Sequence, residues 1–396
     1  MKRLTTCMLP IALVLVVAAP VYSAEPGDGQ EAAIAAIKKL RGSVELDRNK
    51  AVVGVSLRGT KVTDAILEHL KGLTKLETLD LDKTKVTDAG LVHLKGLTKL
   101  RKLRLNFSPL ITGAGLEHLK GLKSLKQLEL DFSEVTDAGL VHLKGLTDLE
   151  DLKLCCTYVT DAGLQHLKAL TSLRSLELGG TNITGAGLEH LKGLSRLEVL
   201  GLFELKVTDA ELEHLKGMTN LLALDLAGTK VTDAGLAHLK ALTKLQTLKL
   251  THGHVTDAGL ERLKGLTNLE DLGLGYTKIT GAGLKHLKGL SKLKKLALFR
   301  TKVADAGLVH LKGLKRLEQL DLWDTKVTDA GLKDIRGLTS LVDLNLSSTG
   351  VTDDGLVHLK GLTNLDRLNL AGTLVTDEGV KLLRQALPTC KVFHKE

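Results

Sequence analysis

The sequence predicts an α/β fold in the form of a curved solenoid, a horseshoe with a parallel sheet on its concave face and short helices on its convex face. Three observations lead to this fold class. A unit of 24 residues recurs fourteen times from Val52 onward. Only 2% of the 396 residues are aromatic, so the core must be built from aliphatic side chains. Each unit joins a segment with strand-type alternation to a segment with helical spacing.

The first half of each unit predicts a strand. The repeat that starts at Leu76 reads LETLDLDKTKVTDAGLVHLKGLTK. Leu79 and Leu81 alternate with Asp80 and Asp82, so we expect one face of the strand to be buried and the other to be wet. The hydrophobic share of 43% fits such a folded chain and argues against global disorder.

The second half of each unit predicts a short helix. Thr87 is an expected N-cap, and Asp88 in the first turn favours the positive end of the helix. Leu91 and Leu94 follow at helical spacing and are expected to pack on the strand layer. Strands repeat every ~4.8 Å, whereas packed helices need ~8–10 Å. The array is therefore predicted to curve, with its sheet on the concave side.

A glycine recurs in the middle of the predicted helices. Gly90 and its equivalents occupy this position in 12 of 14 repeats, and the exceptions are Ile66 and Glu211. Glycine in a helix interior costs about 1 kcal/mol relative to alanine. We therefore expect neighbouring helices to approach one another closely at this position.

The repeat resembles the leucine-rich repeat family. It matches the family pattern L-x-x-L-x-L-x-x-N/C-x-L except at Thr84, which stands at the Asn/Cys place. The segment V-T-D-A-G-L-x-H-L-K-G-L is similar to the class found in F-box proteins and in many exported bacterial proteins. The resemblance covers about residues 52 to 388 and implies a solenoid that binds other molecules. It extends only to the repeats, so ubiquitin-ligase function is not implied.

The chain divides into four predicted parts. Residues 1–23 read as a secretory signal, because Lys2 and Arg3 precede a short apolar run and small residues. An uncleaved membrane anchor is the alternative, although the run is shorter than the ~20 residues of a membrane-spanning helix. Residues 24–51 are a predicted N-terminal cap, 52–388 the repeats and 389–396 a C-terminal cap strand. The protein is therefore predicted to be exported to the periplasm, the cell surface or the medium, and not to span a membrane once the signal is removed.

Charge and cysteine content narrow the classes of partner. The formal charge is +9, which suits anionic surfaces as well as solubility. Nucleic acid is not expected as a partner, because no aromatic residues interleave with the basic ones and the protein is predicted to be exported. Beyond the signal only Cys155, Cys156 and Cys390 remain, which is not a disulfide framework, and we expect free, partly buried thiols.

Two rows of side chains run along the predicted helices. Eleven histidines share one repeat position and are interpreted as a stacked structural row, since a helix-spaced row does not converge on a metal. His252 and His254 lie outside this row, but two histidines without a third ligand predict no metal site. A Lys or Arg also occurs once in every repeat, from Lys71 to Arg384. This ridge is either a solvated face or a docking surface for an anionic polymer.

The aromatic residues give the sharpest functional signal. Seven of them fall just beyond the predicted strands. They form two predicted groups on consecutive repeats, Phe107/Phe132/Tyr158 and Tyr276/Phe299/Trp323, and Phe203 stands apart. Grouped, exposed aromatic residues are typical of interface anchors, and the alternative is that they seal the edge of the core. The predicted ligand-binding residues are Phe107, Phe132, Tyr158, Phe203, Tyr276, Phe299 and Trp323.

These observations predict a non-enzymatic scaffold that recognises a protein ligand on its concave face. No catalytic motif and no phosphate-binding glycine loop is present, so neither a catalytic residue nor a cofactor nor a metal is predicted. The alternative function is that of a cell-envelope structural protein that binds an anionic surface polymer through the Lys/Arg ridge. Binding through the ridge would weaken steeply with salt, and aromatic anchoring much less.

Overall fold

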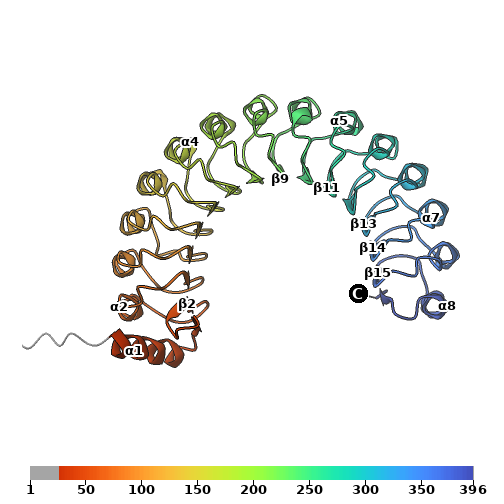
Figure 1. Ribbon diagram of the computed structural model, residues 1–396. Helices are drawn as coiled ribbons and strands as arrows, with labels where there is room; N and C mark the ends of the chain where they lie inside the picture. The colour runs from red at the N-terminus through yellow and green to blue at the C-terminus, as the bar shows by residue number, and fades with distance from the viewer. Residues whose placement is uncertain (1–25, 396) are drawn as a thin grey trace, which may run out of the picture.

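The computed structural model describes residues 26–395, and the predicted signal at 1–23 lies outside the described residues. The chain forms an open horseshoe with strands along the inner side and helical turns along the outer side (Figure 1). The strands follow one another in chain order in a single sheet of sixteen. β1 (Ser43–Leu46) pairs antiparallel with β2 (Val52–Ser56), and every later neighbour is parallel. The predicted solenoid is therefore confirmed.

The strands of the repeats are short and in register. Leu79 in one strand faces Leu103 in the next, so the buried leucines form continuous lines across the sheet. The remaining strands are β3 (Thr78–Asp80), β4 (Lys102–Arg104), β5 (Gln127–Glu129), β6 (Asp151–Lys153), β7 (Ser175–Glu177), β8 (Val199–Gly201), β9 (Ala223–Asp225), β10 (Thr247–Lys249), β11 (Asp271–Gly273), β12 (Lys295–Ala297), β13 (Gln319–Asp321), β14 (Asp343–Asn345), β15 (Arg367–Asn369) and β16 (Lys391–Phe393).

The convex side carries only one or two helical turns per repeat. The α-helices are α1 (Pro26–Lys39), α2 (Ala65–Leu70), α3 (Asp137–Leu140), α4 (Asp161–Leu164), α5 (Asp257–Arg262), α6 (Asp305–Leu308), α7 (Asp329–Ile335) and α8 (Asp377–Ala386). The 3₁₀ segments are η1 (Gly90–Leu94), η2 (Gly115–Leu119), η3 (Val141–Leu143), η4 (Gln165–Leu167), η5 (Gly185–Leu191), η6 (Glu211–Leu215), η7 (Gly235–Ala241), η8 (Gly283–Leu287), η9 (Val309–Leu311) and η10 (Asp353–His358). Turns this short are stable only because their leucines are buried against the sheet. No helix within 26–395 is long and apolar enough to cross a membrane.

The aspartate of the first helical turn joins most repeats to the next. Asp88 Oδ1 accepts the backbone N–H of Thr112 at 2.8 Å, and its Oδ2 accepts the Thr112 hydroxyl at 2.5 Å. The same Asp–Thr bond recurs along the array, so the carboxylate ties two repeats together rather than only capping its own turn. The further pairs are Asp64–Thr87, Asp137–Thr160, Asp161–Thr184, Asp209–Thr232, Asp233–Thr256, Asp257–Thr280, Asp305–Thr328, Asp329–Thr352 and Asp353–Thr376.

This Asp–Thr bond explains the recurrent mid-helix glycine. A Cβ placed on Gly115 would collide with the carboxylate of Asp88, and a Cβ on Gly90 would collide with that of Asp64. The predicted close approach is thus confirmed, and its cause is the carboxylate of the preceding repeat. Ile66 is tolerated because its repeat is the first and has no such aspartate before it.

At the junction between the repeats that start at Leu173 and Leu197, the carboxylate and the glycine exchange places. Gly185 stands where the aspartate would be, and Glu211 stands where the next repeat would carry its glycine. Glu211 Oε2 accepts the N–H of Thr208 at 2.9 Å and its hydroxyl at 2.7 Å. The carboxylate therefore comes from the other side of the junction, and the bond to the threonine is kept.

Candidate binding surface

Alternate side chains of each strand face the inside of the horseshoe. In the repeat that starts at Leu76, Leu79 and Leu81 are buried, while Asp80 projects from the sheet. The strands line the inner curve in Figure 1, so these projecting side chains form a concave face from β2 to β16. The residue two places beyond each strand continues the same inner face, and we call it the inner-edge residue.

The residue after the inner-edge residue has a left-handed backbone in all fourteen repeats. Its φ lies between 50° and 69°, and its N–H donates to a carbonyl of the next repeat, as from Phe107 to Asp131 at 2.8 Å. A left-handed residue with a side chain costs roughly 1–2 kcal/mol, yet only four of these positions are glycine. They are Gly59, Lys83, Phe107, Phe132, Cys156, Gly180, Glu204, Gly228, His252, Tyr276, Arg300, Asp324, Ser348 and Gly372. We call this row the turn column.

Three predicted residues meet in one group toward the C-terminal end. The ring centroids of Tyr276 and Phe299 are 5.6 Å apart, and those of Phe299 and Trp323 are 5.9 Å apart. Two residues absent from the prediction complete the group. His252 stacks on Tyr276 at 4.1 Å, and the Arg300 guanidinium lies 4.8 Å from the Trp323 centroid. We call these five residues, from four consecutive repeats, the C-terminal cluster.

Arg300 holds the C-terminal cluster together. Its guanidinium donates to the Tyr276 hydroxyl at 2.7 Å and to Asp324 at 2.8 Å, and it lies 5.0 Å from the Tyr276 ring centroid. A cation placed over aromatic faces gains about 0.5–2 kcal/mol per contact. The cluster is therefore a fixed arrangement of rings around one charge. The sequence offered a signal for Arg300 and His252, because both share the turn column with Tyr276.

The predicted N-terminal group is smaller than expected. The Phe107 and Phe132 rings are parallel with centroids 4.6 Å apart, and the Lys83 ammonium lies 4.9 Å from the Phe107 centroid. Their exposed fractions are 44% and 48%. Tyr158 is 53% exposed and contacts no other aromatic ring in the described part of the chain, because it lies two residues beyond the turn column. The three-membered group is thus wrong, and we call the Phe107–Phe132 pair the N-terminal stack.

Phe203 stands apart from both groups. Its ring covers Gly179 of the preceding repeat, where a Cβ would collide with it, and Phe299 covers Gly275 in the same way. Both rings are half-buried inner-edge residues. Each ring therefore closes a gap over a glycine at the edge of the core, as the alternative interpretation expected, and remains partly exposed.

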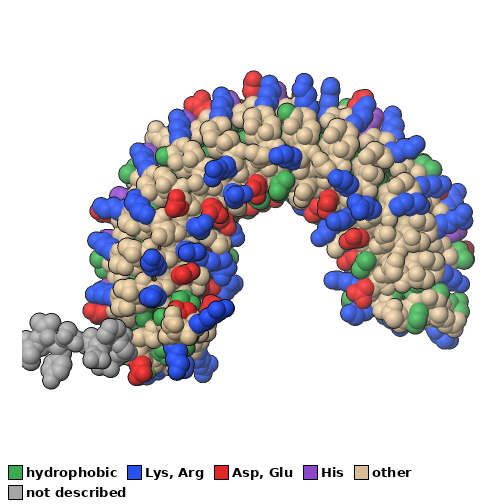
Figure 2. Space-filling view, in the orientation of Figure 1, with side chains coloured by type: hydrophobic (Ala, Val, Ile, Leu, Met, Phe, Trp, Pro, Cys, Tyr) green, Lys and Arg blue, Asp and Glu red, His purple; other side chains and the backbone are tan. Residues whose placement is uncertain are grey.

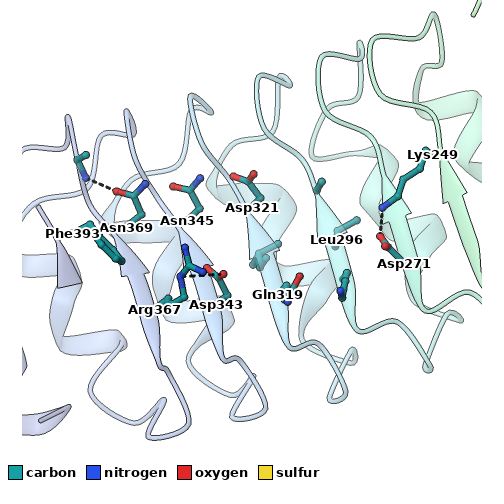
Figure 3. A pocket seen from close by; sticks show the side chains of 14 residues that line it. Lys249, Asp271, Leu296, Gln319, Asp321, Asp343, Asn345, Arg367, Asn369 and Phe393 are labelled. Atoms are coloured by element: carbon teal, nitrogen blue, oxygen red, sulfur yellow. Dashed lines mark hydrogen bonds and ion pairs between the residues drawn. The ribbon is translucent and has the colours of Figure 1, made fainter. Parts of the chain in front are cut away.

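A polar hollow of 730 Å³ lies on the concave face beside the C-terminal cluster (Figure 3). Figure 3 shows Asp321, Asn345 and Asn369 in one row across neighbouring strands. A second row is formed by Gln319, Asp343 and Arg367. The Arg367 guanidinium lies 3.8 Å from the Asp343 carboxylate. The lining residue Asp321 lies two residues before Trp323 in the same repeat, so the hollow and the cluster share this part of the face. An extended chain lying here would meet amide and charged groups along its length and aromatic rings at one side.

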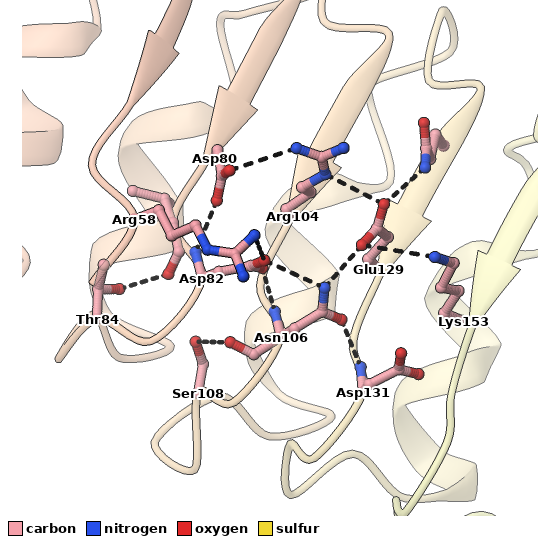
Figure 4. A network of polar contacts seen from close by, with 12 residues as sticks. Arg58, Asp80, Asp82, Thr84, Arg104, Asn106, Ser108, Glu129, Asp131 and Lys153 are labelled. Atoms are coloured by element: carbon pink, nitrogen blue, oxygen red, sulfur yellow. Dashed lines mark hydrogen bonds and ion pairs between the residues drawn. The ribbon is translucent and has the colours of Figure 1, made fainter. Parts of the chain in front are cut away.

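The corresponding N-terminal part of the face carries a polar network (Figure 4), and two of its residues, Asp80 and Arg104, also line a smaller hollow of 310 Å³. Arg104 bridges Asp80 at 3.4 Å and Glu129 at 3.2 Å. Asn106 donates to Glu129 at 2.7 Å and to Asp82 at 3.4 Å, and its backbone N–H donates to Asp82 at 2.8 Å. Asp82 is only 3% exposed, so the prediction that it is wet was wrong. Alternation put Asp82 on the exposed face, but neighbouring side chains cover it.

Burial sets the acidity of these carboxyl groups. Burial raises the pKa of Asp82, and nearby Asp80 adds to the effect despite the Asn106 hydrogen bonds. Burial also opposes ionisation of Glu129, but the Asn106 hydrogen bond and the charges of Lys153 and Arg104 outweigh it and lower the pKa. Further along the face, burial together with Asp225 and Asp131 raises the pKa of Glu177 to about 7.

The convex side carries the two predicted rows. The basic ridge is exposed in every repeat, and Lys and Arg side chains follow the outer rim in Figure 2. Its members are Lys71, Lys95, Lys120, Lys144, Lys168, Lys192, Lys216, Lys240, Lys264, Lys288, Lys312, Arg336, Lys360 and Arg384. The histidines are half-buried, except His69, and five of them have a buried Nδ1 without a partner. They are His69, His93, His118, His142, His166, His190, His214, His238, His286, His310 and His358.

The cysteines and acidic groups assemble no metal-binding cluster within residues 26–395. No three His, Cys, Asp or Glu side chains in this range are placed to hold a metal ion. Cys155, Cys156 and Cys390 are free thiols. Burial, together with the nearby Asp131, raises the pKa of Cys155, so this thiol stays protonated and unreactive at neutral pH.

Comparison with known proteins agrees with this geometry. The sequence model described as the leucine-rich repeat matches five repeats, at residues 72–94, 169–192, 217–239, 241–264 and 337–359. The chain has the leucine-rich repeat fold. No curated protein sequence matches it.

Solved leucine-rich repeat structures share the fold. An internalin from Listeria monocytogenes is 23% identical with a TM-score of 0.59, and the match covers 96% of this chain and 98% of that one. A leucine-rich repeat protein of Leptospira interrogans is 21% identical, with a TM-score of 0.58 and coverage of 82% and 91%. The ectodomain of the Arabidopsis receptor kinase HAESA, solved with a peptide hormone ligand, is 16% identical, with a TM-score of 0.60 and coverage of 93% and 70%.

Proposed function

We propose that this leucine-rich repeat protein is an exported, non-enzymatic scaffold that binds a protein ligand on its concave face. The C-terminal cluster is the principal anchor, and the adjoining hollow holds an extended segment of the ligand. The observation that carries the proposal is that five side chains from four consecutive repeats join into one group of rings around Arg300. Binding energy at interfaces concentrates in such aromatic and arginine clusters.

The other predicted aromatic residues have subsidiary roles in this proposal. The N-terminal stack exposes the edges of its rings to a ligand, and Tyr158 adds a separate contact. Phe203 presents one side of its ring between the two regions. Solenoids of this fold take peptides, since the HAESA ectodomain was solved with a peptide hormone ligand. Export follows from the predicted signal at 1–23.

Affinity capture from an envelope extract tests the proposal. The full chain is compared with a Tyr276→Ala/Phe299→Ala/Trp323→Ala variant and with a matched Val92→Ala/Val141→Ala/Val309→Ala variant, which removes exposed apolar groups from the convex side. We expect the parent and the convex control to retain the same protein, and the cluster variant to lose it. Equal capture by all three chains would contradict the site.

Salt separates this proposal from the alternative function. If the chain is instead a structural protein that holds an anionic polymer along its basic ridge, the captured material is released steeply between 50 mM and 500 mM salt. Retention through aromatic anchoring changes little over that range. A polymer captured equally by the parent and the cluster variant, and released by salt, would favour the ridge.

A further inference from the structure

A basic hollow of 480 Å³ lies on the convex side between two successive repeats. It is separate from the concave surface and is lined by four cationic side chains and one carboxylate. The lining residues are Lys312, Lys315, Lys333, Asp334, Arg336 and Gly337. Two of the cations, Lys312 and Arg336, belong to the basic ridge, and the other two are additions to it.

The hollow arises where the repeat departs from its usual sequence at three places. Lys315 stands where eleven repeats carry Thr or Ser. Lys333 stands where five repeats carry Glu and where two others, with Lys285 and Lys381, also carry Lys. Asp334 replaces the histidine that eleven repeats share. Lys315 and Lys333 add two positive charges beside the ridge residues Lys312 and Arg336. The combination of all three changes occurs at this junction and distinguishes it from the other repeats.

Four other ridge lysines pair with a glutamate three residues earlier, whereas the two added lysines have no carboxylate partner within residues 26–395. Lys120 pairs with Glu117 at 3.1 Å and Lys264 with Glu261 at 2.8 Å, each three residues earlier in the chain. The residue three before Arg336 is Lys333, so this pair is repulsive instead. Across residues 26–395, no carboxylate forms an ion pair with Lys315, Lys333 or Arg336.

The contacts of Asp334 and Lys315 leave the added positive charges without a counter-charge. The one lining carboxylate, Asp334, is largely buried and bonds Lys312 at 2.9 Å, so it is already neutralised. The Lys315 ammonium donates one hydrogen bond to the carbonyl of Gly337 at 2.9 Å. This bond positions the ammonium and leaves its other N–H groups able to donate to a ligand. Lys315, Lys333 and Arg336 thus line the hollow without an ion-pair partner in the described part of the chain, and Lys315 uses one of its donors on the Gly337 carbonyl.

We propose that this hollow binds a phosphate group of an anionic polymer. A guanidinium and two ammonium groups offer several charge-assisted donors to one tetrahedral oxyanion. A bound phosphate relieves the repulsion between Lys333 and Arg336, which the empty site bears. The proposal goes beyond the concave-face function and does not depend on it, and it gives the basic ridge one preferred point of attachment.

The chain contains its own control for this site. Lys123 occupies the same repeat position as Lys315, and it donates to the carbonyl of Gly145 at 2.9 Å in the same way. Val141 stands there in place of Lys333, and the ridge residue Lys120 is paired with Glu117. A Lys123→Gln/Lys144→Gln variant therefore removes the same charge as Lys315→Gln/Lys333→Gln, from a comparable junction that has Val141 in place of the second added lysine.

Titration with fluorescent linear inorganic polyphosphate tests the proposal, using the full chain at 150 mM salt. We expect Lys315→Gln/Lys333→Gln to raise the Kd at least tenfold, and the control pair to raise it less than twofold. A Lys333→Arg variant should bind as the parent does. Equal weakening by both double variants would show that the ridge acts uniformly, and no binding by the parent would also overturn the proposal.

Thermal unfolding gives a second readout that does not depend on the labelled polymer. Polyphosphate should raise the Tm of the parent and of the control pair, because a ligand of the folded state stabilises it, but not the Tm of Lys315→Gln/Lys333→Gln. The cluster variant Tyr276→Ala/Phe299→Ala/Trp323→Ala should keep its polyphosphate binding. Failure of the concave site and failure of this site are therefore distinguishable. An equal rise of Tm in all of these chains would contradict a specific site.

Discussion

The N-terminal stack and the C-terminal cluster place aromatic side chains at the same turn column, with different results. Phe107 and Phe132 cover one another, and the inner face beside them is occupied by the network of Arg104 and Glu129. Tyr276 instead meets two inner-edge rings, Phe299 and Trp323, next to an open hollow. An aromatic residue in the turn column therefore becomes part of a broad surface only where the inner-edge residues are also aromatic and the neighbouring strands leave room.

The prediction with the largest expected effect tests the difference between the two regions directly. Trp323→Ala should weaken binding of the captured ligand by about 2–4 kcal/mol, because a ring at the centre of a packed cluster carries most of the binding energy. Phe132→Ala should cost less than about 1 kcal/mol, since its ring packs against one other ring, that of Phe107, and not within a larger cluster. Titration calorimetry with the purified ligand measures both. A larger loss for Phe132→Ala would assign the anchor to the N-terminal stack.

A second prediction concerns Glu177, which lies between the two regions. Its pKa is raised from 4.5 to about 7, so the folded protein holds a proton that the unfolded chain releases above pH 4.5. The folded state is therefore penalised progressively as the pH rises from 4.5 to 7, and fully above that. Glu177→Gln should raise the free energy of unfolding by about 1–3 kcal/mol at pH 8 and leave it unchanged at pH 4.

Urea unfolding at the two pH values measures this difference. The matched control is Glu318→Gln, because Glu318 is a carboxylate outside the concave network. A stabilisation by Glu177→Gln that is equal at pH 4 and pH 8 would show that lost charge is not its cause. The result shows whether the concave face between the two regions carries unfavourable negative charge. Such a charge would be neutralised by a basic group of the ligand.

The smallest expected effect concerns the junction that connects the two regions. Glu211→Gly removes both bonds to Thr208 and should destabilise the protein by about 1 kcal/mol. Adding Gly185→Asp to that change restores the usual Asp–Thr bond and should recover the loss. Gly185→Asp alone places two carboxylates together and should destabilise. Urea midpoints of the four chains measure the coupling, and simple additivity of the two changes would contradict it.

The sequence predicted the fold well because its signal is repeated fourteen times. Every buried leucine in a strand or helical turn follows from a period that no single repeat could have established. The predicted site was less complete, because ring contacts depend on which repeat position each residue occupies. Phe299 and Trp323 are inner-edge residues, Tyr276 is in the turn column, and Tyr158 lies two residues further on. Grouping by consecutive repeats alone therefore placed Tyr158 wrongly.

Other parts of the site were missed for a different physical reason. Arg300 and His252 are polar, so a search for exposed aromatic residues passed over the guanidinium that joins the rings. The burial of Asp82 was missed because alternation says which face a side chain takes but not what covers it. Asn106 covers it from the next repeat, and only the assembled sheet brings the two together.

The carboxylate at Glu211 also limits how the array can grow or shrink. If the repeat at 173–196 were excised in frame, Asp161 would lie directly before Thr208 and Glu211, and two negative groups would compete for one threonine. Loss of the repeat at 197–220 would instead place Gly185 before Gly235, a pairing of the kind already present at Gly113 and Gly139. Loss of the repeat at 197–220 alone should therefore be tolerated, whereas loss of the repeat at 173–196 alone should destabilise the array. The Glu211 carboxylate thus limits which repeat can be lost at this junction.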